Sequence, residues 1–179
     1  MPRTATVPQR GIFASFASIR TLTNIFVGSV ALMFAMTATA DILGTTGTNP
    51  NGLALDTAGN VYTANNGSNN VSKITPDGTS SIFATTGTGP GGIVLDAAGN
   101  LYTANSGSNN VSKITPDGIS SILGKTGTKP RGIVLDAAGN VYTANNGSSN
   151  VSKITPDGTS SIILGTTDIG PAGIVLDAA

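Results

Sequence analysis

The stretch Gly59-Asn60-Val61-Tyr62-Thr63-Ala64-Asn65 occurs three times in this chain of 179 residues, at intervals of forty positions. It returns over residues 99–105, with leucine in place of the valine, and over residues 139–145 without change. A fixed period of this length is typical of repeat proteins, in which each unit buries apolar surface against its neighbours. The period divides the chain into units 50–89, 90–129 and 130–170, followed by the opening of a fourth at 171–179. The third unit is one residue longer, and we expect the extra residue near Asp168.

Each unit is predicted to form four short strands, because short runs of apolar and β-branched residues alternate with Gly, Pro, Asn and Asp. In the first unit these strands are expected over residues 52–56, 60–64, 70–75 and 80–84. The last two are joined by Pro76-Asp77-Gly78, in which proline presets the first corner of a tight turn and glycine tolerates the last. Single strands are also expected over residues 42–46 and 173–177.

Four antiparallel strands in each unit are the proportion of one blade of a β-propeller, so the predicted fold class is all-β. Adjacent apolar residues, such as Val61 with Tyr62 and Ile82 with Phe83, place apolar side chains on both faces of each sheet. Such a sheet needs a neighbouring sheet on either side. We therefore expect a partial β-propeller of three full blades with fragments of two more.

Residues 1–40 differ from the rest of the chain and have the pattern of a secretory signal peptide. Three arginines are the only charged side chains in this segment, an apolar run covers residues 25–36, and the segment ends in Ala38-Thr39-Ala40. We expect cleavage after Ala40, which predicts a protein that is secreted, periplasmic or at the cell surface. An organelle presequence and an uncleaved membrane anchor stay open as alternatives, although the run is shorter than the ~20 apolar residues of a membrane span.

Composition argues against several classes of function. After residue 40 the chain carries nine aspartates and six basic side chains without a long run of like charge. Neither a nucleic-acid-binding stripe nor a basic membrane-binding patch is therefore predicted. The chain contains no cysteine, which removes disulfides and thiolate chemistry. It also contains no histidine and no glutamate. A general base near neutral pH is usually a histidine or a buried carboxylate, so only aspartate is available for that role.

Two segments of the second unit resemble the NHL repeat. Residues 90–102, Pro-Gly-Gly-Ile-Val-Leu-Asp-Ala-Ala-Gly-Asn-Leu-Tyr, are similar to its opening, and residues 109–118, Asn-Asn-Val-Ser-Lys-Ile-Thr-Pro-Asp-Gly, to its second half. The resemblance extends over the whole chain after residue 40 and, more distantly, to virginiamycin B lyase-like and gluconolactonase-like propellers. It implies a β-propeller, most often of six blades.

Two departures from the NHL pattern remove charge from the loop between the second and third strands. The family usually has aspartate at the end of the second strand and often has arginine at the start of the third. This chain has asparagine at both places, at Asn65, Asn105, Asn145, Asn70, Asn110 and Asn150. The resemblance implies a basic face for RNA-binding members, so the neutral loops argue against RNA as a partner.

The enzymes among the similar propellers set demands that this sequence does not meet. The resemblance implies histidine and glutamate for acid–base work in the streptogramin lyases, and a divalent metal held by Glu, Asn and Asp in the lactonase-like hydrolases. Within the units, only Lys125, Lys129, Arg131 and Asp168 break the repeat with charge, and they form no recognisable pair of nucleophile and base. We therefore expect a non-catalytic exported protein, without a cofactor, whose propeller surface binds protein or carbohydrate. The alternative is a fragment of a propeller lyase or lactonase whose catalytic residues are absent from this chain.

Asparagines at one face of the propeller are the candidate ligand contacts, because amide side chains offer both donors and acceptors. A simpler interpretation is that asparagine accommodates tight loops. The candidates, with two cations that break the repeat, are Asn65, Asn66, Asn69, Asn105, Asn109, Asn145, Asn146, Lys129 and Arg131.

Aspartates at the end of each first strand are the candidates for a metal site, at Asp56, Asp96 and Asp136, with Asp177 at the same repeat position. A ring of carboxylates along a central channel would offer calcium the oxygen ligands it prefers. We favour the other interpretation, in which each carboxylate caps the turn that follows it, and expect no metal.

Three blades form an open arc whose terminal faces lack a neighbour, and unpaired sheet edges invite association. The arc is interpreted as an interrupted gene product, as half of a six-bladed ring formed by two copies, or as an arc that folds poorly. The expected partners are a second copy of the chain, or a protein or glycan ligand. Nucleic acid is not expected as a partner, nor is a membrane once residues 1–40 are cleaved.

Overall fold

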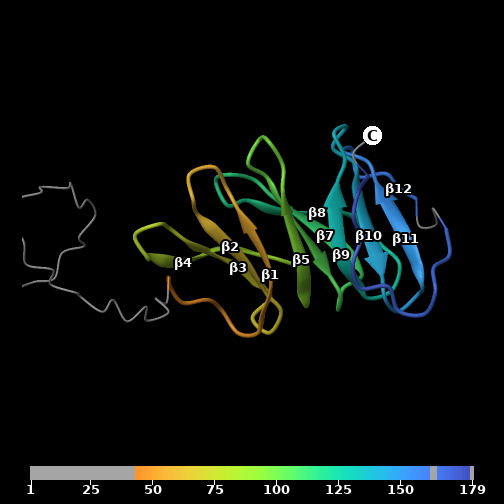
Figure 1. Ribbon diagram of the computed structural model, residues 1–179, viewed down its shortest axis with the longest axis horizontal. Helices are drawn as coiled ribbons and strands as arrows, with labels where there is room; N and C mark the ends of the chain where they lie inside the picture. The colour runs from red at the N-terminus through yellow and green to blue at the C-terminus, as the bar shows by residue number, and fades with distance from the viewer. Residues whose placement is uncertain (1–42, 162–164, 178–179) are drawn as a thin grey trace, which may run out of the picture. The chain divides into compact units, whose positions relative to one another are not determined.

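The computed structural model describes residues 43–161 and 165–177, so the predicted signal peptide at residues 1–40 lies outside the described residues. Within these two ranges there are twelve strands, and no helix is long and apolar enough to cross a membrane. The strands are β1 (Pro50–Leu55), β2 (Val61–Asn65), β3 (Asn70–Ile74), β4 (Ser80–Thr85), β5 (Pro90–Leu95), β6 (Leu101–Asn105), β7 (Asn110–Ile114), β8 (Ser120–Lys125), β9 (Pro130–Leu135), β10 (Val141–Asn145), β11 (Asn150–Ile154) and β12 (Ser160–Ser161). They form three four-stranded antiparallel sheets, β1–β4, β5–β8 and β9–β12, which we call blades 1, 2 and 3 (Figure 1).

The four strands predicted for each unit are confirmed, and the boundaries in blade 1 differ from the expected ones by one or two residues. The turn between β3 and β4 lies at Pro76-Asp77-Gly78, where Gly78 has a φ of 86° that glycine adopts without strain. The Thr75 hydroxyl donates to the Asp77 carboxylate, which also accepts the backbone N–H of Thr79 at 3.1 Å. Local polar contacts thus close the turn from residues that are adjacent in the sequence.

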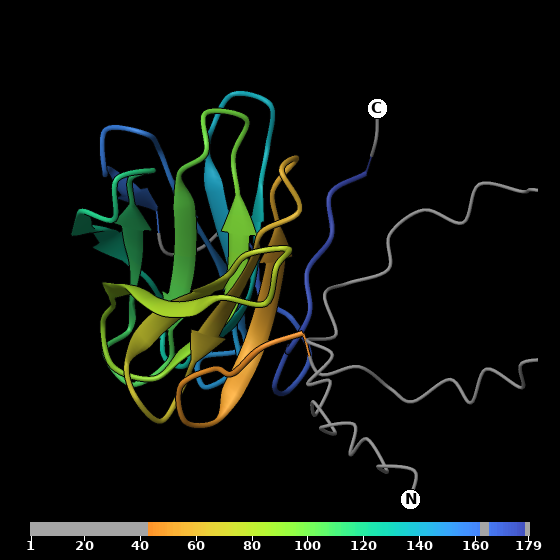
Figure 2. The ribbon, with the colours of Figure 1, turned by 90° about the vertical axis from the view of Figure 1, so that its left-hand side faces the viewer.

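Successive blades pack face to face, as Figures 1 and 2 show for the three sheets in chain order. We call the face of a blade that meets the preceding blade its leading face, and the opposite one its trailing face. Between blades 1 and 2 the trailing face contributes Tyr62, Ala64, Val71 and Ala84, and the leading face contributes Ile93, Leu95, Leu101 and Ile114. A second cluster repeats this packing between blades 2 and 3. The expectation of apolar side chains on both faces of a sheet is confirmed.

The first strands of the blades, β1, β5 and β9, contact one another in turn at the inner side of the arc. Their close approach requires glycine. A Cβ on Gly92 would lie 2.5 Å from the backbone oxygen of Arg131 on the next blade, and Gly132 has the same relation to Ala172 at 2.8 Å. Because no real Cβ tolerates such distances, the glycine at this repeat position sets the spacing between neighbouring blades.

The sequence suggested that the extra residue of the third unit lies near Asp168, and the structure shows that it does not. Thr166 forms a bridge with Asn150, as Lys125 does with Asn110 in blade 2, and the Thr167 N–H donates to the Ser149 backbone oxygen at 2.9 Å. The outer strand has therefore regained the register of the other blades at Thr166. The insertion precedes that position, after β12.

The single strands expected over residues 42–46 and 173–177 are not formed among the described residues, 43–46 and 173–177. Residues 171–177 take the place of a first strand beside β9, since Ala172 and Gly173 approach Gly132. Among the described residues, no strand pairs with this segment by backbone hydrogen bonds, and a strand needs such a partner. The fragment of a further blade is thus present, but its backbone forms no hydrogen-bonded strand pair with the described residues.

Candidate functional site

Each blade carries an aspartate whose carboxylate is fully engaged by its own turn. Asp96 accepts the backbone N–H of Ala98 at 3.0 Å and of Asn100 at 2.8 Å with one oxygen. Its other oxygen accepts the Asn100 amide at 2.8 Å and the Tyr102 hydroxyl at 3.0 Å. Asp56 and Asp136 make the same contacts in blades 1 and 3. The capping interpretation accounts for all three carboxylates.

These contacts shift the acidity of both partners. Burial opposes ionisation of Asp96, yet the hydrogen bonds from Asn100, Tyr102 and Ala98 outweigh it and hold its pKa below the usual value. Burial and the hydrogen bond to the charged Asp96 raise the pKa of Tyr102 to about 12. The Lys113 ammonium lies over the Tyr102 ring, 5.8 Å from its centroid. Tyr102 on β6 therefore contacts both Asp96, which follows β5, and Lys113 on β7, and these contacts connect three strands of one blade.

The three aspartates do not form a metal centre. Within the described ranges no group of three or more acidic, histidine or cysteine side chains is placed to hold a metal ion. The oxygens that calcium would need already accept hydrogen bonds from the turn and from tyrosine. The arrangement does not fit a calcium ring at Asp56, Asp96 and Asp136.

The asparagine that ends each second strand is buried inside the blade. Asn105 is fully buried, accepts a hydrogen bond from the Thr103 hydroxyl at 2.9 Å, and donates to Asn110 at 2.8 Å and Ser112 at 2.9 Å. Asn65 and Asn145 occupy the same environment in blades 1 and 3 and are also fully buried. None of these three side chains reaches the surface. The hypothesis that they contact a ligand there is therefore wrong for Asn65, Asn105 and Asn145. Their amides are used to satisfy polar groups between strands.

Four further candidate asparagines connect neighbouring blades. Asn69 and Asn109 take left-handed φ values of 54°, and their side-chain oxygens accept the backbone N–H of Gly89 and of Lys129 at 2.8 Å. Asn66 donates to the Pro90 backbone oxygen at 3.3 Å, and Asn146 donates to that of Gly170 at 2.8 Å. All four are half-buried. Their side chains hydrogen-bond to the backbone of the segments that connect one blade to the next. This agrees with the simpler interpretation, in which asparagine accommodates tight loops.

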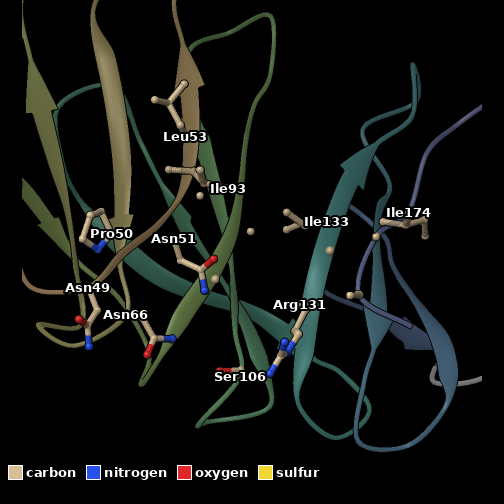
Figure 3. Close-up of a pocket in the computed structure, with 16 residues that line it drawn as sticks. Asn49, Pro50, Asn51, Leu53, Asn66, Ile93, Ser106, Arg131, Ile133 and Ile174 are labelled. Carbon is tan, nitrogen blue, oxygen red and sulfur yellow. The ribbon is translucent and has the colours of Figure 1, made fainter. Parts of the chain in front are cut away.

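A cleft of about 700 Å³ follows the inner strands β1, β5 and β9 and reaches residues 172–174 (Figure 3). Leu53, Ile93, Ile133 and Ile174 supply its apolar lining, and Asn49, Asn51, Asn66, Ser106 and Arg131 supply the polar one. Of the described residues that line it, Arg131 is the only charged one. Figure 3 shows its guanidinium on the same side of the cleft as Ser106, with the Asn51 amide between β1 and β5.

β-Bulges direct the polar side chains into this cleft. In β9 the pairing with β10 passes from Pro130 to Gly132 and leaves Arg131 unpaired. In β1 it passes from Pro50 to Gly52 and leaves Asn51 unpaired in the same way. A bulged residue leaves the regular alternation of the strand, which re-aims its side chain. The repeat thus provides one position per blade that faces the cleft, at Asn51, Gly91 and Arg131.

The structure brings together two of the predicted candidates, Asn66 and Arg131, and separates the other candidate cation, Lys129, from them. Asn66 and Arg131 line the cleft, whereas Lys129 is exposed and does not line it. The sequence interpretation missed Asn49, Asn51 and Ser106. Their signal was variation between units at three repeat positions, for example Asn51, Gly91 and Arg131. This variation is visible once uncharged residues are compared as well as charged ones.

Comparisons by sequence give no assignment: no family model matches the chain, and no curated protein matches it. Solved structures do match. Selenomethionine-substituted virginiamycin B lyase from Staphylococcus aureus is 20% identical, with a TM-score of 0.63, over 73% of this chain and 46% of that one. A streptogramin B lyase is 19% identical, with a TM-score of 0.62, over 71% and 44%. A chain of a nidogen–laminin complex is 27% identical, with a TM-score of 0.63, over 72% and 53%.

These neighbours are β-propellers. The chain is a partial β-propeller. The all-β prediction and the resemblance to NHL-type and virginiamycin B lyase-like propellers are confirmed for the fold. The chain spans about half the length of these neighbours, at 46%, 44% and 53%. At these identities the likeness to the two lyases concerns the fold alone.

Proposed function

We propose that this β-propeller is a non-catalytic binding protein that takes a protein ligand in the cleft along its inner strands. The observation that carries the proposal is the lining of that cleft, which combines apolar side chains with amides and one guanidinium. Concave, mostly apolar sites with a few converging polar groups are the usual form of binding sites. The described lining residues include no carboxylate, imidazole or thiol to act as a general base.

A protein ligand is favoured over the other candidates by the comparison with known propellers. One similar structure is a complex of two proteins, nidogen and laminin. The similar lyases do not support lyase chemistry in this chain, since it contains no histidine and no glutamate. A glycan ligand is the alternative outcome of the test below.

The test is a binding screen with the full-length chain against a random hexapeptide library and a panel of glycans. Gly91→Tyr should fill the cleft, because position 91 lines it and a Cβ there meets nothing closer than 3.7 Å. Thr79→Tyr places the same ring on an exposed turn outside the cleft and serves as control. We expect peptide binding that Gly91→Tyr abolishes and Thr79→Tyr leaves unchanged. Binding of glycans alone, no binding, or turnover of a streptogramin B or a lactone would overturn the proposal.

We also propose that the protein acts outside the cytoplasm. The support is the pattern of residues 1–40, with arginines, an apolar run and an Ala-x-Ala ending. Mass spectrometry of the protein from fractionated cells should find a chain that begins at Asp41 in the secreted, periplasmic or surface fraction. A chain that keeps Met1 and stays in the cytoplasm would contradict this.

A second copy of the chain is proposed as a further partner, at the leading face of blade 1, which no described blade covers. Leu53 and Leu55 on that face are 58% and 59% exposed. The same face of blades 2 and 3 is covered in each case by the trailing face of the blade before it. The trailing face of blade 3 is incompletely covered, since Tyr142 and Val151 are half-buried where Tyr102 and Val111 are buried. Each copy therefore offers the two surfaces that pack together inside the chain.

Native mass spectrometry tests this association. We expect a dimer of the unmodified chain, and a monomer for Leu53→Asp. Ile119→Asp, which changes an exposed apolar residue in a turn of blade 2, should still dimerise. A folded chain that is monomeric at all concentrations, or a dimer that Leu53→Asp does not affect, would contradict the proposed association.

A further inference from the structure

Arg131 is the feature of the cleft that the repeat does not explain. The equivalent residues of the other blades are Asn51 and Gly91, and neither is charged. Arg131 lies in the bulge of β9, is exposed, and is the only charged residue among the described residues that line the cleft. Nothing in the packing of the blades requires a cation there, because Asn51 and Gly91 occupy the same position without one.

No described carboxylate lies among the residues that line the cleft with this guanidinium. The nearest along the strand is Asp136, which follows the opposite end of β9. Five residues of extended strand separate the two backbones by roughly 17 Å. Both oxygens of Asp136 are already engaged by Ala138, Asn140 and Tyr142. The donors of Arg131 are thus directed into a cleft whose described lining carries no anion.

The surroundings of Arg131 define what could lie against it. Ile133 follows two positions later on the same strand, and Ile93 and Leu53 continue the apolar lining across β5 and β1. Figure 3 shows Ile93 and Ile133 on the side of the cleft away from Asn66 and Ser106. A ligand in the cleft therefore meets a guanidinium and amides along one side and aliphatic side chains along the other.

We propose that the cleft binds an extended acidic peptide segment, in which a carboxylate next to an aliphatic side chain pairs with Arg131. This inference rests on the proposed protein-binding function and names the chemistry of its ligand. Arginine matches a carboxylate because its planar fork can donate two parallel N–H bonds to the two oxygens. The aliphatic neighbour of the carboxylate packs on Leu53, which lines the cleft and is 58% exposed. The Asn51 and Asn66 amides supply donors and acceptors to the peptide backbone.

The test measures the affinity of the full-length chain for two acetylated and amidated peptides by fluorescence anisotropy. One alternates leucine with aspartate, and the other replaces every aspartate with asparagine. We expect the aspartate peptide to bind about tenfold more tightly, the ratio that a charge-assisted hydrogen bond provides. Arg131→Gln should remove this preference and leave the weaker binding of the asparagine peptide unchanged.

Lys129→Gln is the matched control, because it removes the same charge two residues away, from a side chain that does not line the cleft. It should preserve the preference for aspartate. Arg131→Lys should restore only part of it, because lysine lacks the fork of donors. Circular dichroism of each variant establishes that the sheets are retained.

The outcomes separate this inference from the function it rests on. If both peptides bind equally and Gly91→Tyr abolishes both, the cleft binds peptides but the role of Arg131 is wrong. If Lys129→Gln removes the preference as fully as Arg131→Gln does, general charge and not the cleft is responsible, which also overturns the inference. If neither peptide binds and the hexapeptide screen is empty, both proposals fail.

Discussion

Blade 1 and blade 2 have nearly the same residues and the same strand pairing, yet their leading faces are in different surroundings. Leu53 of blade 1 is 58% exposed, whereas Ile93 at the same position of blade 2 is 7% exposed. The four strands and their turns form in both blades. The comparison teaches that a unit specifies its own sheet, while the neighbouring blade supplies most of the burial that stabilises it.

Replacing Leu53 and Ile93 by alanine, one at a time, gives the largest expected difference in the free energy of unfolding. Ile93→Ala should lower the free energy of unfolding by about 3 kcal/mol, because it leaves a cavity between Tyr62 and Leu101. Leu53→Ala should cost less than about 1 kcal/mol, because its side chain is mostly in solvent. Urea unfolding followed by circular dichroism measures both. Equal losses would show that the leading face of blade 1 is covered in solution, as the proposed dimer requires at high concentration.

The glycines of the inner strands extend the comparison to the other end of the arc. Gly92→Ala should lower the free energy of unfolding by about 2 kcal/mol, because its Cβ would collide with the backbone of Arg131. Gly173→Ala, at the same repeat position, should have little effect, because nothing lies within 4 Å of its Cβ. Urea unfolding of the two variants measures the difference. A costly Gly173→Ala would mean that another blade packs there.

Buried and half-buried asparagines at adjacent positions of the repeat differ in the same way. Asn105→Ala should cost about 1–2 kcal/mol, because it removes three hydrogen bonds of a fully buried side chain, to Thr103, Asn110 and Ser112. Asn66→Ala removes one long hydrogen bond, of 3.3 Å, from a half-buried residue and should cost less. Thermal unfolding of both variants tests the order of the two effects. If Asn66→Ala cost more than Asn105→Ala, the hydrogen bonds of Asn105 would contribute less to stability than its burial predicts.

The sequence was sufficient to predict the strands, because their signals are local. Pro76-Asp77-Gly78 closes its turn with residues that touch within the turn, and Asp96 caps its own hairpin with Asn100. Each such motif can be interpreted from a few consecutive residues. Repetition added the order of the sheets, since identical units pack in one way.

The site could not be predicted in the same way, because its residues come from different blades. Asn66 and Asn105 look alike in sequence, but only Asn105 is enclosed by Thr103, Asn110 and Ser112. The lining of the cleft depends on bulges that direct Asn51 and Arg131 inward, and a bulge is a property of strand pairing. Variation at one repeat position was the only trace of it in the sequence.

The tyrosines of blades 1 and 2 provide the smallest difference, one that depends on pH. Burial raises the pKa of Tyr102 to about 12, and burial followed by the charge of Asp56 raises the pKa of Tyr62 by less. The folded state therefore holds the phenol proton more tightly than the unfolded state, whose tyrosine ionises near pH 10. This stabilisation is complete below about pH 10 and is lost as the pH rises towards about 12.

Urea midpoints between about pH 9 and about pH 12 measure the effect for the unmodified chain, Tyr102→Phe and Tyr62→Phe. Tyr102→Phe should flatten the alkaline loss of stability, because the variant has no proton to release at that position. Tyr62→Phe should flatten it less, because the pKa of Tyr62 is raised less. Parallel curves for all three proteins would show that neither tyrosine carries the alkaline transition. A larger effect of Tyr62→Phe would mean that the pKa of Tyr62 is raised more than that of Tyr102, which would contradict the expected order.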